Sequence, residues 1–204
     1  MLEAFVQTDG NAAVGIVYEG EEVFGSNFGQ NAADILQSFR RMFPSENVQV
    51  AAKPSPFAKK ALSTVRDVYD GKGASELISI NVDRFPAFSQ RVLRAVARVP
   101  VGYVVSYGGV ADAVGGGPRA VGNVMAGNCF APLVPCHRVV TSNLGLGGYG
   151  GGGGSLRTKF EFLKREKHGY KESKDISTEG GLMRVFPVEI VLTKLEKSGI
   201  FGCT

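Results

Sequence analysis

The 204-residue sequence has few of the residues that build cross-linked or metal-bound proteins. Its three cysteines are Cys129, Cys136 and Cys203, and its two histidines are His137 and His168. Three cysteines do not form a disulfide framework, and there is no CxxC or HxxxH pair to supply two ligands from one segment. We therefore expect no metal and no other cofactor, and a reducing intracellular compartment.

Long apolar runs are also missing. No stretch approaches the ~20 apolar residues that cross a bilayer. The N-terminal sequence MLEAFVQTDG lacks the basic and then apolar regions of a secretory leader, so we expect neither a membrane partner nor export. With 44% hydrophobic and 21% charged residues, the composition is that of a globular protein with one large domain or two small ones.

The net charge of +4 is unevenly distributed along the chain. Residues 1–84 carry 8 Lys and Arg against 11 Asp and Glu, and residues 171–204 carry 5 of each. Residues 85–170 carry 10 against 3, a net of +7. A solubility surface would spread its charge more evenly, so the basic middle segment is the candidate surface for phosphates.

The first 80 residues predict an α/β scaffold domain. Three short apolar or alternating runs (EAFVQT, AVGIVYEG and EEVFGSNF), separated by Asp-Gly and Glu-Gly turns, predict a meander of strands. Two amphipathic helices follow, one capped by Asn31 and one with Pro56 in its first turn. This domain has no His or Cys and only scattered carboxylates, so we expect it to be non-catalytic.

Residues 81–170 predict a second, mostly helical domain. After a first helix over AFSQRVLRAVARVP, a helix from about Tyr107 to Val114, a turn at residues 115–117 and a helix starting at Pro118 have helix-turn-helix spacing. The last of these helices carries small residues and one long side chain, Arg119, so its backbone can approach a groove closely.

The stretch PLVPCHRVV, residues 132–140, places Cys136 and His137 in an apolar run that predicts a buried strand. A structural cysteine needs no basic neighbour, whereas a nucleophilic one does. Adjacent strand residues point to opposite faces, so His137 would reach the thiol through a bridging water. The downstream Glu166 could orient the imidazole, and we expect this pair to depress the pKa of the thiol.

A glycine-rich segment follows, with eight glycines among residues 145–154. It is not a P-loop, because no Gly-Lys-Ser/Thr follows. It is either a flexible linker or a loop whose backbone N–H groups approach a ligand, with Tyr149 as its aromatic residue. The next helix, LRTKFEFLKREKHG, carries Lys159 and Glu166 on one face. Residues 171–204 predict a tail with one strand or helix, and no role follows from its sequence.

Together, RAVGNVMAGN, VPCHRVV, the Gly-x-Gly-Gly-Tyr loop and the helix after it resemble the O6-alkylguanine-DNA alkyltransferases over residues 80–170. These repair proteins flip a damaged guanine through the minor groove and move its alkyl group to their own cysteine. The resemblance implies a ribonuclease-H-like N-terminal lobe, and a C-terminal domain with a helix-turn-helix and an active-site cysteine strand.

The resemblance also implies the roles of individual residues. Cys136 would accept the alkyl group, His137 would take its proton through a water, and Glu166 would hold His137. Asn128 would fix the turn before the cysteine strand, and Lys159 would stabilise the far side of the pocket. The implied catalytic set is Cys136, His137, Glu166, Asn128, Tyr107 and Lys159.

The remaining implied roles concern the base and the duplex. Tyr149 and Met125 would form walls of the pocket, while the Val139 carbonyl and the Gly150 N–H would contact the guanine edge. Arg119 would fill the place of the flipped base, and Tyr107 would crowd its phosphate and donate to guanine N3. Other implied DNA contacts are small residues and hydroxyls: Ser89, Ser106, Ala120, Gly122 and Ser142.

The sequence departs from the family pattern at two places. Where the family has Asn-Pro-x-Pro, this chain reads Asn128-Cys129-Phe130-Ala131, so we expect a looser turn. Gly150 replaces a serine, which leaves the backbone donor in place. Some members bind zinc through N-terminal Cys and His; this lobe has neither, so no zinc is expected.

The resemblance predicts one-shot repair of O6-alkylguanine, and of O4-alkylthymine, by a monomer acting on double-stranded DNA. The expected location is cytoplasmic, with the nucleoid, in a prokaryote and nuclear in a eukaryote. Two alternatives remain. An alkyltransferase-like module would bind damage without transfer, but such proteins usually lack the cysteine. A Cys-His hydrolase would need an oxyanion hole and repeated turnover.

Overall fold

The structure is a computed structural model that describes residues 1–10, 12–74, 77–149 and 155–198. The chain divides into two compact units: unit 1 is Met1–Arg84 with Cys129–Leu133, and unit 2 is Phe85–Asn128 with Val134–Thr204. The division therefore falls four residues after the expected one, and a short segment following Asn128 belongs to the N-terminal unit. No helix in the described ranges is long and apolar enough to span a membrane.

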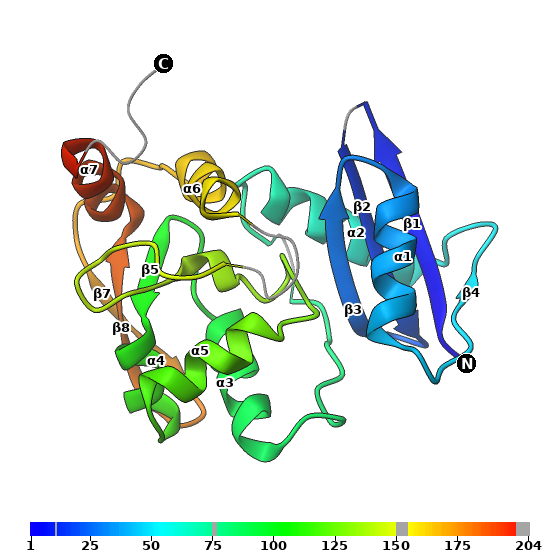
Figure 1. Ribbon diagram of the computed structural model, residues 1–204, viewed down its shortest axis with the longest axis horizontal. Coiled ribbons are helices and arrows are strands. Elements are labelled where there is room, and N and C mark those ends of the chain that lie inside the picture. Colours follow the sequence, from blue (N-terminus) through cyan, green and yellow to red (C-terminus); the bar gives the residue numbers. More distant parts are fainter. Residues whose placement is uncertain (11, 75–76, 150–154, 199–204) are drawn as a thin grey trace. The chain divides into compact units, whose positions relative to one another are not determined.

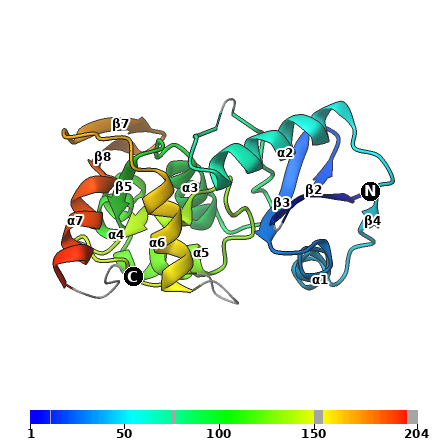
Figure 2. The same ribbon diagram turned by 90° about the horizontal axis from the view of Figure 1, so that it is seen from above.

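Unit 1 is a four-stranded sheet with a helix on each face (Figures 1 and 2). The strand order is β3-β2-β1-β4, antiparallel except for the parallel pair of β1 and β4. The expected meander and both helices are confirmed. Their bounds are β1 Glu3–Asp9, β2 Ala12–Glu19, β3 Glu22–Gly29, α1 Ala32–Met42, β4 Gln49–Val50 and α2 Pro56–Tyr69.

The helices of unit 1 begin where the sequence predicts. The Asn31 side chain accepts from the Asp34 N–H at 2.9 Å, which caps α1, and Pro56 occupies the first turn of α2. Ile35 and Phe39 of α1 pack on Ala4 and other small or branched side chains of the sheet. Unit 1 thus builds one core from its strands and amphipathic helices.

The segment that replaces the two family prolines is hydrogen-bonded into unit 1. The Ser26 N–H donates to the Cys129 carbonyl at 2.9 Å, and the Ser26 hydroxyl donates to the Ala131 carbonyl at 3.1 Å. The Arg84 guanidinium lies 3.1 Å from the Cys129 sulfur. Burial raises the pKa of the Cys129 thiol, with the Arg84 charge acting in the opposite direction. These contacts, in place of ring stiffness, fix the segment.

Unit 2 is built on a second four-stranded sheet, of order β6-β5-β8-β7, so it is less helical than the sequence predicts. The β5–β6 pair is parallel, and the β5–β8 and β7–β8 pairs are antiparallel. Its elements are α3 Ala87–Ala97, β5 Tyr103–Ser106, α4 Tyr107–Val114, α5 Pro118–Ala126, the 3₁₀ turn η1 Cys136–Arg138, β6 Val139–Val140, α6 Leu156–Arg165, β7 Lys174–Thr178, β8 Gly181–Pro187 and α7 Val188–Ser198. Helix α4 has the predicted bounds, and α5 begins at Pro118 as predicted.

The predicted cysteine strand is wrong. Cys136–Arg138 form one 3₁₀ turn, closed by the Arg138 N–H donating to the Pro135 carbonyl at 2.8 Å, and only Val139–Val140 pair with β5. A short apolar run indicates burial without distinguishing a strand from another buried conformation. Pro135 also has no N–H to donate to a neighbouring strand.

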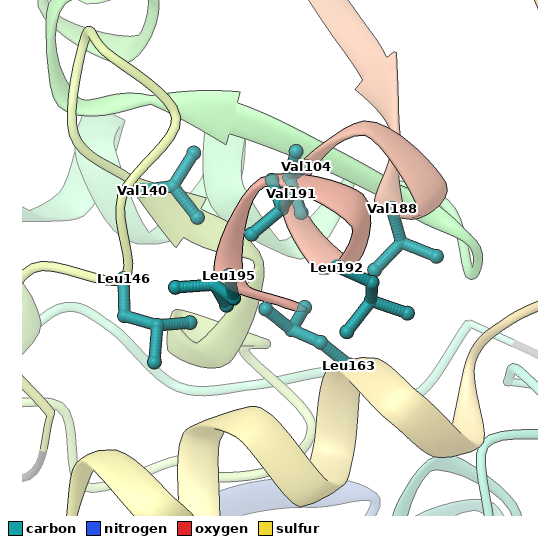
Figure 3. Packing of buried hydrophobic residues seen from close by; sticks show 8 residues of the cluster. All are labelled: Val104, Val140, Leu146, Leu163, Val188, Val191, Leu192 and Leu195. Atoms are coloured by element: carbon teal, nitrogen blue, oxygen red, sulfur yellow. The ribbon is translucent and has the colours of Figure 1, made fainter. Parts of the chain in front are cut away.

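Residues 174–198 form part of unit 2 rather than a separate tail. Strand β8 pairs with β5, and the β7–β8 hairpin is followed by α7. In Figure 3, side chains of α7 meet others from β5, β6, α6 and the loop after β6. The buried cluster consists of Val104, Val140, Leu146, Leu163, Val188, Val191, Leu192 and Leu195.

The docking of the β7–β8 hairpin gives a stability prediction. A Cβ at Gly180, in the hairpin turn, would lie 2.0 Å from the Ala113 carbonyl oxygen. Because a backbone carbonyl cannot rotate away as a side chain can, Gly180→Ala should lower the free energy of unfolding by about 1–3 kcal/mol. Urea denaturation measures this. Gly127→Ala, whose nearest atom would be 3.8 Å away, is the control; equal losses in both variants would contradict the prediction.

Candidate active site

Cys136 opens into a cavity of about 300 Å³. The Cys136 side chain is buried at the start of η1, and the walls come from α4, α5 and the loop after β6. The cavity is lined by Tyr107, Gly122, Met125, Ala126, Cys136, Gly148 and Tyr149. Segments that are far apart in the sequence therefore surround one sulfur atom.

Behind the cysteine, the carboxylate of Glu166 is completely buried and accepts from several donors. Its Oε1 lies 2.8 Å from His137 Nε2. The Arg138 guanidinium bonds both oxygens, with contacts of 2.7 to 3.0 Å, and also donates to the Val99 carbonyl at 2.6 Å. The Gly102 N–H faces Oε2 at 3.4 Å. A buried charge with this many partners is a stable anion.

The pKa values of Glu166 and His137 determine which atoms of this network carry protons. Burial alone would raise the pKa of Glu166, but His137 and Arg138 lower it to about 2. Burial lowers the pKa of His137, against the opposing pull of Glu166. The pair is therefore a carboxylate and a neutral imidazole. Because a carboxylate only accepts, Nε2 carries the ring proton and Nδ1 keeps its lone pair.

His137 Nδ1 is buried and has no hydrogen-bond partner within the described part of the chain. An unpaired buried acceptor is unfavourable unless a water or a substrate group reaches it. The His137 ring is fixed from the other side by stacking on Phe162, with the ring centroids 4.6 Å apart. The imidazole is thus a held, neutral base with a free lone pair.

Burial raises the pKa of the Cys136 thiol. A hydrogen bond from the Asn128 side chain and the Lys159 charge lower it, but less strongly. The expectation that His137 and Glu166 depress the resting pKa of this cysteine is therefore wrong. The sulfur is a neutral thiol at rest, and the neutral imidazole next to it in sequence can take its proton only during a reaction.

Lys159 is fully buried beside the cavity. Its ammonium donates to the Val139 carbonyl at 2.5 Å and to the Gly148 carbonyl at 3.1 Å. Burial lowers its pKa to about 8, with Cys136 acting in the opposite direction. The Tyr107 hydroxyl donates to the same Gly148 carbonyl at 3.5 Å. Two side chains from different helices thus hold one carbonyl of the glycine-rich loop.

The other residues expected at the site are distributed over unit 2. Asn128 donates to the Val134 carbonyl at 2.8 Å, so it does close the turn before the cysteine. Met125 and Tyr149 line the cavity, and Gly150 lies outside the described residues. The candidate DNA contacts are Ser89 on α3, Ser106 as the N-cap of α4, Arg119 and Ala120 exposed on α5, Gly122 at the cavity and Ser142 exposed after β6.

Sequence reasoning missed Arg138 and Gly102. The signal for Arg138 was present, since a charged residue in an apolar run must be paired if it is buried. A strand would have sent His137 and Arg138 to opposite faces, whereas the 3₁₀ turn lets both reach Glu166. The Gly102 contact has no local signal, because it depends on how two distant segments pack.

The family model for the DNA-binding domain of 6-O-methylguanine DNA methyltransferase matches residues 87–168. A methylated-DNA--protein-cysteine methyltransferase of Mycobacterium leprae is 46% identical over 83 residues, 40% of this chain and 48% of that relative. The Mycobacterium tuberculosis protein of the same name is 39% identical over 112 residues, 52% of this chain and 66% of that relative. This chain is related to the O6-methylguanine DNA methyltransferases.

Solved structures of this family extend the likeness beyond the matched segment. M. tuberculosis O6-methylguanine methyltransferase has a TM-score of 0.62 at 25% identity, covering 84% of this chain and 96% of that one. An M. tuberculosis OGT in complex with DNA has a TM-score of 0.63 at 26% identity, covering 81% and 92%. The two-sheet α/β fold is therefore that of the family, although the sequence match spans only about half of the first curated relative.

The ionised state of Glu166 predicts a pH-dependent contribution to stability. Its pKa falls from an ordinary 4.5 to about 2 on folding. The stabilisation is therefore fully present above pH ~4.5 and is lost as the pH falls toward 2. At neutral pH, Glu166→Gln should cost about 3 kcal/mol, because it leaves the Arg138 charge buried without its counterion. The difference between wild type and variant should shrink below pH ~4.5.

Urea denaturation at several pH values measures that difference. Glu161→Gln, on the same helix but outside the network, is the matched control and should change stability little at any of them. A Glu166→Gln penalty that stays constant from pH 7 to pH 3 would contradict the assigned ionisation.

Proposed function

We propose that this chain repairs alkylated DNA by moving the alkyl group of O6-alkylguanine to Cys136, once per molecule. The observation that carries the proposal is a buried thiol at the wall of a cavity, followed in the chain by a neutral imidazole with a free Nδ1. This arrangement suits a nucleophile whose proton is removed as it attacks, and a one-carbon transfer needs no oxyanion hole.

The atoms of the step balance without a cofactor. The Cys136 sulfur forms a bond to the alkyl carbon, and the bond from that carbon to guanine O6 breaks. The thiol proton passes through a bridging water to His137 Nδ1, and Glu166 stabilises the imidazolium that forms. Burial raises the pKa of Tyr107, so its hydroxyl is protonated at neutral pH. It donates that proton to guanine N3 as the base leaves. The His137 proton then passes through solvent to the Tyr107 oxygen, and the proton on guanine N3 is exchanged through solvent for one on N1, so the net products are a thioether and unmodified guanine.

The cavity is suited to a flipped base, which must be held in line with the sulfur. Met125 and Tyr149 supply apolar and aromatic surface on its walls. Lys159 neutralises negative charge developing near the sulfur and fixes the Gly148 carbonyl. The Val139 carbonyl, which already accepts from Lys159, retains a second lone pair for the guanine edge, and the Gly150 N–H is its proposed companion.

The DNA-binding part of the proposal is that α4 and α5 act as a helix-turn-helix that enters the minor groove. The turn at residues 115–117 and the small residues of α5 allow close approach, and Arg119 is exposed at the start of α5. Ser89, Ser106 and Ser142 would contact phosphates. In unit 1, the sheet order with β4 parallel to β1 supports the ribonuclease-H-like reading. Monomeric action and repair of O4-alkylthymine complete the proposal.

The defining prediction is stoichiometric. A thioether cannot be hydrolysed by a base as an acyl intermediate can, so a duplex containing O6-methylguanine should methylate each molecule once, on Cys136. Intact mass and peptide mapping measure this. Cys136→Ser should bind the duplex without transfer, and Cys129→Ser should leave the 1:1 stoichiometry unchanged. Continued turnover, or methyl on Cys129, would rule the function out.

The second prediction concerns Arg119. Flipping a base costs a few kcal/mol, and an arginine that occupies the gap offsets part of it. Arg119→Ala should therefore slow transfer from duplex DNA by about 10-fold or more, at roughly 1.4 kcal/mol per decade, while transfer from free O6-benzylguanine stays within about twofold. Single-turnover rates on the two substrates decide the matter; equal losses on both would exclude the proposed finger.

A further inference from the structure

The helix α7 lies outside the segment that matches the family model, which ends at residue 168. It nevertheless packs into the core of unit 2, against side chains of β5, β6, α6 and the loop after β6 (Figure 3). The family model therefore says nothing about α7, but the contacts at the two ends of the helix indicate its role. The inference below rests on the proposed alkyl transfer.

At its first turn, α7 holds the chain that leaves Glu166. The Glu189 carboxylate accepts from the Gly169 N–H at 2.5 Å and from the Tyr170 N–H at 3.2 Å. The Tyr170 ring covers Gly102, where an added Cβ would lie 2.5 Å from that ring. Gly102 in turn presents its N–H to Glu166. One end of α7 thus fixes the backbone around the buried carboxylate.

At its last turns, α7 holds the loop between β6 and the cavity. The Lys194 ammonium donates to the Asn143 carbonyl. Asn143 lies within a tight turn in which the Thr141 N–H donates to the Gly145 carbonyl at 3.0 Å. The next residue, Leu146, is buried in the cluster to which α7 contributes Leu192 and Leu195.

From Leu146, the chain runs directly into the pocket wall. Gly147 has a φ of +66°, and an added Cβ would lie 3.0 Å from the Tyr107 ring. The next carbonyl, that of Gly148, accepts from Lys159 and Tyr107. A glycine-rich backbone has high conformational entropy, so its position must be imposed from outside the loop. The anchored turn and Leu146 impose it.

We propose that α7 is a positioning element for alkyl transfer, which ties the loop bearing Gly148 and Tyr149 to α6, the helix that carries Lys159. Leu163 of α6 belongs to the same cluster as Leu146 and Leu195, so α7 contacts both α6 and the loop that continues into the cavity wall. Displacement of a pocket wall by about 1 Å is enough to weaken binding and in-line attack. Lys194 is the positioning residue on the loop side.

The test compares variants of two lysines on α7 with free O6-benzylguanine as the substrate. Lys194→Ala should raise the half-saturating concentration about 2- to 10-fold, the range expected for one lost hydrogen bond. The limiting rate constant should change less, because Cys136, His137 and Glu166 remain in place. Lys194→Arg, which keeps a donor, should restore the wild-type value. Lys197→Ala, at an exposed lysine of the same helix, should leave it unchanged.

A Lys194→Ala half-saturating concentration equal to that of wild type, or an equal rise in Lys197→Ala, would overturn the inference. If the wild type itself transfers nothing, the proposed function fails, and the anchoring is then judged by amide hydrogen exchange of residues 141–149. Exchange should be faster in Lys194→Ala than in wild type and in Lys197→Ala. Unchanged exchange in that segment would overturn the anchoring independently of activity.

Discussion

The buried carboxylate of Glu166 is the group on which the rest of the site depends. Removing a carboxylate from water is costly, and Glu166 is stabilised only because His137, Arg138 and the Gly102 N–H all face it. Glu166 in turn keeps the ring proton of His137 on Nε2 and neutralises the charge of Arg138. The 3₁₀ turn is the backbone conformation that lets consecutive side chains reach this one anion.

This constraint accounts for the resting state of the proposed nucleophile. A thiolate reacts with oxidants and stray electrophiles, whereas a buried neutral thiol is comparatively inert. Burial keeps Cys136 protonated and also keeps His137 neutral. In the resting state the thiol therefore does not transfer its proton to the imidazole. If Cys136 is used once per molecule, as proposed, this low resting reactivity is an advantage, because every unproductive reaction at that sulfur would remove one molecule from use.

The sequence was sufficient where a signal is local. Caps, glycine turns and apolar periodicity located α1, α2, α4 and α5, and the Pro-Cys-His-Arg-Val pattern located the candidate site. It failed where the outcome depends on distant packing. The run ending at Val140 indicated burial but not a 3₁₀ turn, and Arg138 looked like part of a basic segment until its partner was known. The sequence of β8 is compatible with a strand, but nothing in it indicates that this strand pairs with β5.

Glu166 holds His137 as a neutral base with an unprotonated Nδ1. Nitrogen-15 NMR of the histidine side chains reports the protonation of each ring nitrogen, and His137→Gln identifies which signals belong to this residue. His137 should carry its proton on Nε2 and none on Nδ1 at pH 7 and above, and Glu166→Gln should disturb this state. A His137 that is doubly protonated at pH 7, or protonated on Nδ1 alone, would contradict this assignment.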